Sequence, residues 1–423
     1  MAVRGKGRRL MGKHNGKVGA LSSPTWETLE VWARVKVQEF VQALLEEEVS
    51  ALLGREKSER RSAVDAAVGY RNGYGKPRRL AMSNGTITVR RPRVRDVEER
   101  FESRILPLFA RRTKEVGELL PQLYLHGLAQ GDFELALRGL LGEGAPLSPA
   151  SIARLRAKWQ LEYEAWCRRS LDGEPVVYVW ADGIYVKAGL EREKAALLVV
   201  IGAFRDGRKE VLAVVPGYRE STESWAGVLR DLKARGLSTP KLVVADGHLG
   251  IWSALAQVWP EAREQRCWNH KILGVLDQLP RKVQVEAKPL LTRIPYAPTR
   301  REAERQRKEF TRRYGSWYPK AMQVLEADWE RMVTFYDFPE AHWKHLRTTN
   351  VVESPFAAVR LRTTAAKRFK KVPNATALIW RVLMVAENRF RRLDAPELLA
   401  LVAAGENFID GQLPVSVNRK AVA

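Results

Sequence analysis

Cysteine is scarce in this chain, with only Cys167 and Cys267 among 423 residues. Two cysteines cannot form a disulfide framework, so the sequence favours a protein that folds in a reducing compartment. Long apolar runs are lacking as well, and no stretch approaches the length of a membrane-spanning helix. No signal peptide opens the sequence. We therefore expect a cytoplasmic protein with no membrane partner.

Acidic side chains are in short supply: 49 Asp and Glu stand against 72 Lys and Arg, a formal net charge of +23. Such an excess favours a polyanionic partner, and nucleic acid is the first candidate. An anionic membrane surface is the alternative, which the lack of a long apolar segment disfavours. The hydrophobic content of 45% is enough for packed interiors, and the length predicts two to four domains.

The first part of the chain predicts a basic arm, a long helix and a β-hairpin. Residues 1–22 are rich in glycine and cations, as in a flexible arm or a cloning remnant. Apolar spacing predicts an amphipathic helix over residues 26–53, and Asn84-Gly85 between two β-prone segments predicts a hairpin. Arg90 and Arg91 lie on its arms, either as DNA phosphate contacts or as an ordinary solvated face.

Residues 114–169 predict short helices separated by glycine turns, with Ser148 as the N-cap of the last one, which carries Arg154. Such helices are compatible with a helix-turn-helix unit or with a plain helical bundle. Together with the hairpin and the basic charge, they predict an N-terminal DNA-binding region over residues 23–172. Arg154 is a candidate DNA contact within it.

The pattern then changes to strands. Asp182-Gly183 ends the first of them and Asp246-Gly247 ends the fourth; the four cover residues 176–181, 195–204, 211–215 and 241–245. Helices are predicted from Ser221 to residue 236 and from residue 251 to Trp259, before Pro260. Three strands in a meander, followed by alternating helix and strand, predict an α/β fold with a mixed sheet and helices on its faces.

After His270 the pattern becomes helical and basic, and it ends in a last helical part around Glu353. We interpret the middle block as an all-helical insertion that separates this last part from its sheet. The expected divisions are 173–271 for the first part of the sheet domain, 272–347 for the insertion, 348–395 for the final helices and 396–423 for a C-terminal tail.

Asp182, Asp246 and Glu353 each have an ordinary structural explanation. Asp-Gly is a common turn, and Glu353 is placed to close a capping box with Asn350 as the helix cap. Together the three would offer the carboxylate oxygens that Mg²⁺ or Mn²⁺ prefers. Two such ions promote in-line phosphoryl displacement. If Glu353 lies outside the site, Glu220 or Glu223 is the next residue to test.

Several short segments of this sequence resemble those of the bacterial Mutator-type insertion-sequence transposases. They are Gly69–Tyr74, Asp182–Lys187, Asp246-Gly247, Arg266–Lys271 and Thr348–Ser354, and the resemblance covers about residues 26 to 410. Pro355 looks less usual for the family but is tolerated in a first helical turn. The resemblance implies an RNase H-like mixed sheet with helices on both faces. An all-helical insertion interrupts it, and a helical and β-hairpin N-terminal DNA-binding region precedes it.

The same resemblance implies an activity. Asp182, Asp246 and Glu353 would be the metal-binding triad of a DDE transposase, with two ions of Mg²⁺ or Mn²⁺. The reaction would be strand cleavage by water at the element's terminal inverted repeats, then attack of a 3′-hydroxyl on target DNA. Because two ends must be brought together, we expect a homodimer or a higher homo-oligomer, located in the cytoplasm at the nucleoid.

Two other functions remain open at this point. One is another RNase H-like nuclease, which the long basic insertion and the N-terminal region disfavour. The other is a catalytically inactive DNA-binding protein derived from a transposase, which the presence of all three acids disfavours. A strand-transfer assay would separate both from the transposase.

Two further cations follow Glu353 on its predicted helix. Arg360 and Lys367 are seven and fourteen positions on, so they would share its face. They would either hold DNA phosphates beside the metal ions or form an ordinary basic stripe.

The spacing of Cys267 and His270 is compatible with a zinc site, for which His342 and His345 would supply the other two ligands. A structural role without metal is the preferred interpretation. In that role Cys267 and His270 brace the sheet against the insertion, as the Cys-x2-His of the resembling family suggests.

Overall fold

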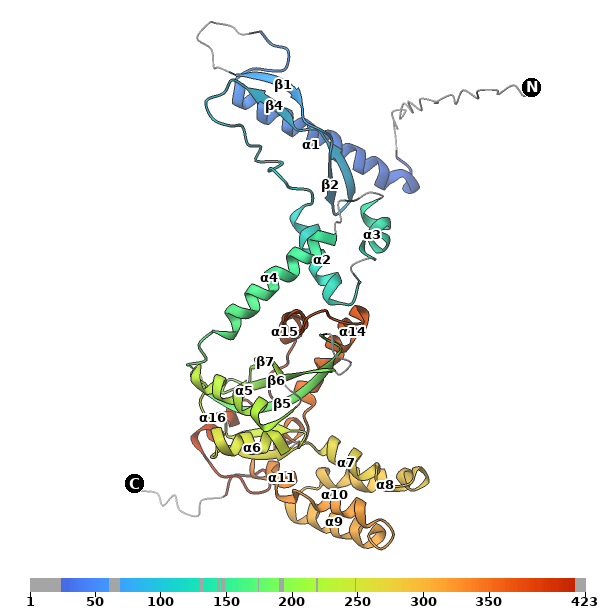
Figure 1. Cartoon of the computed structure of the whole chain (residues 1–423), viewed down its shortest axis with the longest axis vertical. Helices are drawn as coiled ribbons and strands as arrows, with labels where there is room; N and C mark the ends of the chain where they lie inside the picture. The colour runs from blue at the N-terminus through green and yellow to red at the C-terminus, as the bar shows by residue number, and fades with distance from the viewer. Residues whose placement is uncertain are drawn as a thin grey trace, which may run out of the picture. The chain divides into compact units, whose positions relative to one another are not determined.

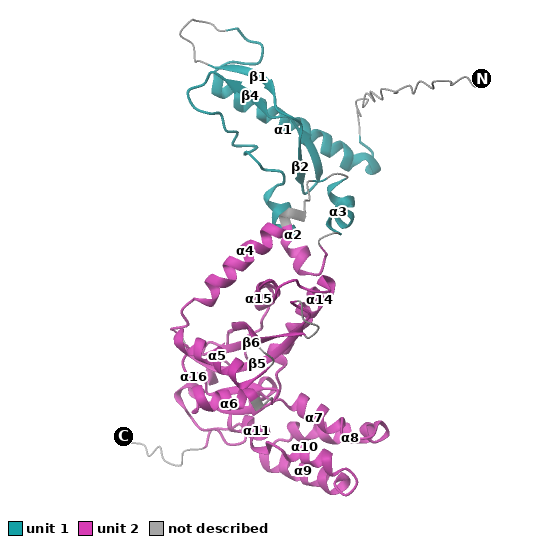
Figure 2. Ribbon diagram, viewed as in Figure 1, with its two compact units in different colours: residues 1–120, 131–148 teal, residues 121–130, 149–423 magenta. Residues whose placement is uncertain are grey.

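The computed structural model describes residues 24–60, 69–129, 132–142, 145, 149–173, 175–189, 194–217, 220–247 and 249–414. The arm predicted over residues 1–22 lies outside them, as does the tail beyond residue 414. The chain divides into two compact units, residues 1–120 with 131–148 and residues 121–130 with 149–423 (Figure 2).

Unit 1 is built from a long helix and an antiparallel β-ribbon (Figure 1). The hairpin predicted at Asn84-Gly85 is confirmed, because Met82 pairs with Gly85 across the turn. Leu45, on the helix, packs against Ile87 of the ribbon and Leu106 in a small apolar core. The elements are η1 (Trp26–Thr28), α1 (Leu29–Leu53), β1 (Tyr70–Tyr74), β2 (Arg78–Met82), β3 (Gly85–Val89), β4 (Pro92–Arg95) and α3 (Phe133–Leu141). The unit boundary falls inside α2 (Lys114–Leu125).

Unit 2 contains the mixed sheet predicted from the strand pattern. Its order is β7-β6-β5-β8-β9, with β5, β6 and β7 antiparallel and β5, β8 and β9 parallel. The strands are β5 (Val176–Val186), β6 (Ala195–Phe204), β7 (Lys209–Gly217), β8 (Leu242–Ala245) and β9 (Arg263–Arg266). The first and fourth strands of the meander-then-crossover pattern are therefore direct neighbours.

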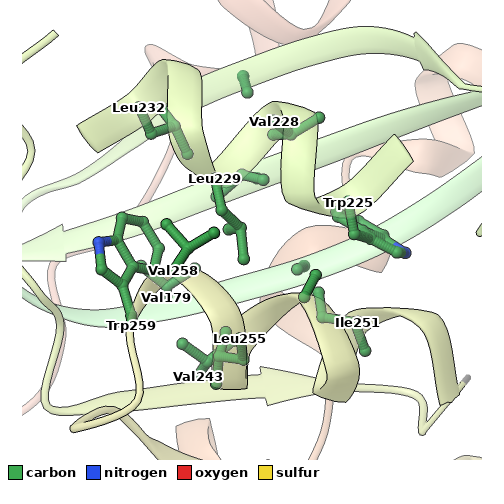
Figure 3. Packing of buried hydrophobic residues seen from close by; sticks show 14 of the residues in the cluster. Val179, Trp225, Val228, Leu229, Leu232, Val243, Ile251, Leu255, Val258 and Trp259 are labelled. Atoms are coloured by element: carbon green, nitrogen blue, oxygen red, sulfur yellow. The ribbon is translucent and has the colours of Figure 1, made fainter. Parts of the chain in front are cut away.

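Helices cover both faces of this sheet. On one face, α5 (Thr222–Ala234) and α6 (Leu249–Val258) pack their apolar sides on β5 and β8, where Leu229 and Leu255 are buried with Val179 (Figure 3). Because side chains alternate along a strand, Tyr178 and Trp180 point to the other face. There they meet the segment of η4 (Glu340–His342) and α12 (Trp343–Leu346).

The segment between β9 and Asn350 is helical, in agreement with the sequence pattern, while the insertion bounds 272–347 stay a prediction. It comprises α7 (Trp268–Leu276), α8 (Arg281–Arg293), η2 (Ile294–Tyr296), α9 (Arg300–Tyr314), α10 (Pro319–Glu326), α11 (Trp329–Val333), η3 (Thr334–Asp337), η4 and α12. The chain returns through α13 (Asn350–Glu353), α14 (Phe356–Ala366), α15 (Val372–Glu387) and α16 (Glu397–Ala404). None of the described helices combines the length and apolar character that a membrane crossing requires.

Two details differ from the sequence prediction. β5 does not end at Ala181 but continues through Asp182 to Val186, because the antiparallel partner β6 pairs with it as far as Ala195. α4 (Pro149–Cys167) belongs to unit 2, where Tyr163 and Trp380 of α15 place their ring centroids 5.8 Å apart. The packing therefore divides the chain before α4 and not at residue 172, while the DNA-binding role of residues 23–172 stays a prediction.

Candidate active site

Asp182 and Asp246 lie at the same level of the sheet. The parallel strands β5 and β8 end their pairing with Ala181 opposite Ala245, so each aspartate is the next residue of its strand. Ligand chemistry in open α/β sheets gathers at the carboxyl ends of such strands. Carboxylate oxygens of Asp182, Asp246 and Glu220 lie within 4.8 Å of one another. The structure thus brings together the two aspartates that the sequence analysis paired.

Glu220 is the third member of this acidic group and is only 7% exposed. It precedes Ser221, whose side chain caps α5. Two glycines leave the space that it occupies: a Cβ atom at Gly183 would lie 2.5 Å from Glu220 Oε1, and one at Gly250 would lie 2.3 Å from the Glu220 carbonyl oxygen. Glu223, the other alternative named from the sequence, is exposed on α5.

The sequence analysis missed Tyr185, which stands beside the acidic group. Burial and a hydrogen bond to Glu220 raise the pKa of this tyrosine to about 12. Its position three residues after Asp182 on the same strand was visible, but its partner was not. Tyr185 therefore affects the acidic group through its hydrogen bond to Glu220.

The surroundings of Asp182 raise the pKa of its carboxyl group. It is 8% exposed, and burial followed by the charge of Asp246 raises its pKa to about 7. The Gly183 N–H donates to Asp182 Oδ1 at 2.7 Å and offsets part of this rise, while Glu353 adds to it. A buried carboxyl that holds its proton this strongly lies among anions without enough positive charge beside them.

Glu353 lies next to this group but not within it. Its carboxylate belongs to a second set with Cys267 and His270, whose ligand atoms lie within 4.8 Å of one another. Glu353 Oε1 is 3.9 Å from His270 Nδ1 and accepts a hydrogen bond from the Thr349 hydroxyl. The charge of Glu353 nevertheless reaches Asp182, since it contributes to the raised pKa there.

The capping box expected for Glu353 and Asn350 is wrong in its details. α13 begins at Asn350, so Thr349 and not Asn350 is the N-cap residue. The Glu353 side chain accordingly returns to the Thr349 hydroxyl, one turn back. A side-chain hydrogen bond from the N-cap residue Thr349 therefore holds this carboxylate, and that partner was not predicted from the sequence.

Cys267 and His270 connect the sheet to α13. Cys267 is fully buried; its N–H donates to the Ala245 carbonyl at 2.8 Å, and its Sγ accepts from the Thr349 N–H at 3.3 Å. The thiol of Cys267, then the charges of Glu353 and Asp246, raise the pKa of His270 to about 9. A cationic imidazole beside the carboxylates lowers their mutual repulsion.

The two histidines considered as further zinc ligands have other partners. His342 Nδ1 accepts from the Tyr178 hydroxyl at 2.8 Å and its Nε2 donates to the Ala395 carbonyl at 3.1 Å. His345 Nε2 is 3.4 Å from Asp394 Oδ1. Among the described residues, neither shares a metal-sized cluster with Cys267 and His270.

A family model described as "Transposase, Mutator family" matches residues 25–392 of this chain, which include both aspartates and Glu353. The chain belongs to the Mutator family of transposases.

Relatives of this Mutator-family transposase agree with the match. It is 45% identical over 298 residues to the transposase for insertion sequence element IS6120 of Mycolicibacterium smegmatis, covering 70% of this chain and 92% of the relative. It is 44% identical over 278 residues to that for IST2 of Acidithiobacillus ferrooxidans, covering 65% and 94%. A solved structure titled "Drosophila P element transposase strand transfer complex" is similar at 11% identity and a TM-score of 0.27, covering 72% of this chain and 85% of that one. That likeness is too weak to support an argument.

Of the two cations predicted to share the face of Glu353 in this transposase, Arg360 lies on α14 and Lys367 lies just beyond its end. α13 ends at Glu353, and Pro355 is the N-cap of a separate helix, α14. Lys367 follows the end of α14 with a left-handed φ of 58°. Lys367 therefore does not continue a helical face counted from Glu353, while the place of Arg360 on that face stays a prediction; Arg360 and Lys367 are both exposed.

The three arginines named in the N-terminal region differ in their surroundings. Arg90 and Arg154 are exposed. Arg91 is partly buried, donates from Nη2 to the Phe101 carbonyl at 2.8 Å and lies 5.5 Å from the centre of the Phe101 ring. Arg91 thus has a structural partner, whereas Arg90 and Arg154 present their side chains to solvent.

Proposed function

We propose that this Mutator-family transposase cleaves DNA at the inverted-repeat ends of its mobile element and joins those ends to target DNA. Asp182, Asp246 and Glu353 are the proposed metal-binding acids. The observation that carries the proposal is the position of Asp182 and Asp246 side by side on parallel strands, where their oxygens lie within 4.8 Å. Family membership supplies the reaction class.

The donor set fits a divalent cation. Carboxylate oxygens are the ligands that Mg²⁺ and Mn²⁺ prefer, and one or two per ion suffice when water and phosphate fill the rest. Burial, and then the charge of Asp246, raise the pKa of Asp182, and a bound cation would favour its charged form. Asp182 and Asp246 would hold the ions, with Glu220 on one side and Glu353 on the other. Two bound ions would activate the attacking oxygen and stabilise the leaving one.

Neighbouring side chains orient these acids. The Thr349 hydroxyl donates to Glu353, and Tyr185 holds Glu220, so each carboxylate is restricted before any ligand arrives. His270, whose pKa is raised to about 9, supplies a positive charge beside Glu353. Such fixed partners set the direction of metal ligands and tune their affinity.

We infer further that unit 2 is an RNase H-like catalytic core and that DNA is the partner of the whole chain. The adjacency of the first and fourth strands, the helices on both faces and the helical insertion before Glu353 support the first point. The net charge of +23 supports the second. Because two element ends must be held together, the active form is a homodimer or a higher homo-oligomer at the nucleoid.

Substitution of the acids tests the proposal. Asp182→Asn, Asp246→Asn and Glu353→Gln should each reduce Mg²⁺-dependent cleavage of element-end DNA by more than the ~10–100-fold typical of outer-shell residues. Binding of the same DNA should be unchanged. Glu223→Gln, an exposed acid on α5, is the matched control.

Two outcomes of this assay would change the assignment. Cleavage at the native rate by Asp182→Asn or Asp246→Asn would end the proposal. Retained cleavage by Glu353→Gln together with loss in Glu220→Gln would remove Glu353 from the triad and put Glu220 in its place.

Thermal stability separates a metal ligand from a turn residue. Asp182→Asn removes one of several repelling anions, so the metal-free variant should melt no lower than the native protein. Mg²⁺ should raise the melting temperature of the native protein by mass action and leave that of the variant nearly unchanged. A loss of stability of ~1 kcal/mol, with the response to Mg²⁺ intact, would instead indicate a turn residue.

A further inference from the structure

Unit 1 contains a cavity of about 860 Å³ that the proposed chemistry does not use. The β-ribbon is interrupted between the β1–β4 pair and the β2–β3 pair, and the cavity lining takes residues from both pairs. Across the interruption, the Gly75 N–H donates to the Arg91 carbonyl at 2.8 Å. The segment that follows β4 also contributes lining residues, among them Phe101 and Arg111. The lining thus combines residues of the β-ribbon with residues of the segment that follows it.

The charged lining of this cavity has one sign. Seven of its fourteen lining residues are Lys or Arg, and none of these described residues is Asp or Glu. The acids of the adjoining segment, Glu98, Glu99 and Glu102, are exposed and stand outside the lining. The charged side chains that line the cavity are therefore all positive.

Two of the arginines are part of the wall. Arg78 Nη1 donates to the Pro107 carbonyl at 3.0 Å, and Arg91 Nη2 donates to the Phe101 carbonyl at 2.8 Å. Burial, then the charges of Arg91 and Arg111, lower the pKa of Arg78. The guanidinium groups of Arg78, Arg91 and Arg111 therefore repel one another, and an anion bound between them would offset that repulsion.

Other cations of the lining are exposed to an incoming ligand. Lys76, Arg93 and Arg111 are exposed, so their side chains are available at the edge of the cavity. Asn72 is the one uncharged polar side chain among the lining residues. A lining with so few groups able to read base edges favours contacts to phosphate, which carry no sequence information.

We propose that this cavity holds the sugar–phosphate backbone of one strand of duplex DNA, with Lys76, Arg93 and Arg111 as phosphate contacts. The inference rests on the proposed function, which makes DNA the substrate. Arginine forks match phosphate oxygens in geometry and charge, and they do so best when the wall is already ordered. The contact positions DNA on unit 1, while base-specific contacts lie elsewhere.

Salt dependence of binding tests this proposal in the full-length protein. Binding is measured by fluorescence anisotropy in EDTA, so that no cleavage occurs, on an element-end duplex and a random duplex of equal length. Arg93→Ala and Lys76→Ala should each weaken binding to both duplexes by the same factor. Each should also reduce the slope of log K against log salt by about 1, because one phosphate contact is lost.

A matched control isolates the cavity from net charge. Arg104→Ala removes the same charge from an exposed position of unit 1 outside the lining and should leave the slope unchanged. Arg93→Lys should keep most of the native slope. Melting temperatures near the native value in all variants show that the slopes report contacts and not unfolding.

Two results would overturn the inference. One is that Arg93→Ala and Lys76→Ala have the slope of Arg104→Ala. The other is that they weaken only the element-end duplex, which would make the cavity a reader of bases. The proposed chemistry fails separately, through native cleavage by Asp182→Asn, so the two ideas are tested independently.

Discussion

Gly183 and Glu220 approach each other more closely than any side chain at position 183 would allow. A Cβ atom at Gly183 would lie 2.5 Å from Glu220 Oε1 and 2.7 Å from Glu220 Cδ. Gly183 directly follows Asp182 on β5, so this approach brings Glu220 against the strand of the first aspartate. Gly250 on α6 meets the Glu220 carbonyl oxygen in the same way. Glycines from two different elements thus set the position of one carboxylate.

Gly183→Ala should therefore displace Glu220 and disturb the acidic group. We expect a loss of stability of about 1–3 kcal/mol, the usual effect of overpacking, together with reduced cleavage. Gly227→Ala is the control: it lies in α5 with nothing within 4 Å of its added Cβ. There alanine should stabilise the helix by about 0.5–1 kcal/mol. Urea unfolding and end-DNA cleavage measure both variants.

A double variant identifies the source of the conflict. If Glu220 is what the new methyl group meets, Gly183→Ala with Glu220→Ala should lose less stability than the two single changes added together. Gly183→Ala behaving like Gly227→Ala would contradict the crowding argument.

The parts of this fold that depend on local pattern could be predicted from the sequence. Short apolar runs rich in β-branched residues predicted the strands, and Asn84-Gly85 predicted the hairpin, because each signal acts over a few residues. The closeness of Asp182 and Asp246 could be anticipated as well. Residues at the same level of neighbouring parallel strands lie close together, so two aspartates that directly follow the paired residues of such strands meet there.

Positions set by packing could not be predicted in the same way. Glu220 approaches Asp182 because Gly183 and Gly250 leave room for it, and both lie far from it in sequence. The misplaced face of Lys367 has a local cause. α14 ends at Ala366 and Lys367 follows it with a left-handed φ of 58°, so a count of helical turns from Glu353 does not reach Lys367.

Cys267 offers a test of whether its buried thiol serves a metal or the fold. Its Sγ accepts from the Thr349 N–H at 3.3 Å, and both residues are fully buried. Cys267→Ala should lose about 1–3 kcal/mol because that N–H is left unsatisfied, and Cys267→Ser should lose less because a hydroxyl also accepts. Chemical denaturation measures both, with and without chelator. We expect chelation to change none of the values; stoichiometric zinc whose removal lowers the melting temperature would refute this.

His342 predicts how stability depends on pH. The side chain is fully buried, and its Nε2 donates to the Ala395 carbonyl while its Nδ1 accepts from the Tyr178 hydroxyl. The bond that Nδ1 accepts requires the neutral ring, and burial lowers the pKa of His342 below its ordinary 6.5. His345 behaves alike: burial, then the charge of Lys209, lowers its pKa to about 4.

The sign follows from proton counting. Below about pH 6.5 the unfolded chain binds protons at these histidines and the folded chain does not, so stability falls as the pH falls, by at most about 1.4 kcal/mol per pH unit for each group. His342→Gln keeps a donor and an acceptor without titrating, so its free energy of unfolding should fall less between about pH 7.5 and about pH 5. Urea unfolding at both values measures the difference, with His126→Gln at an exposed position as the control. If His342→Gln loses as much stability as the native protein and the control, protonation of His342 does not limit stability in acid.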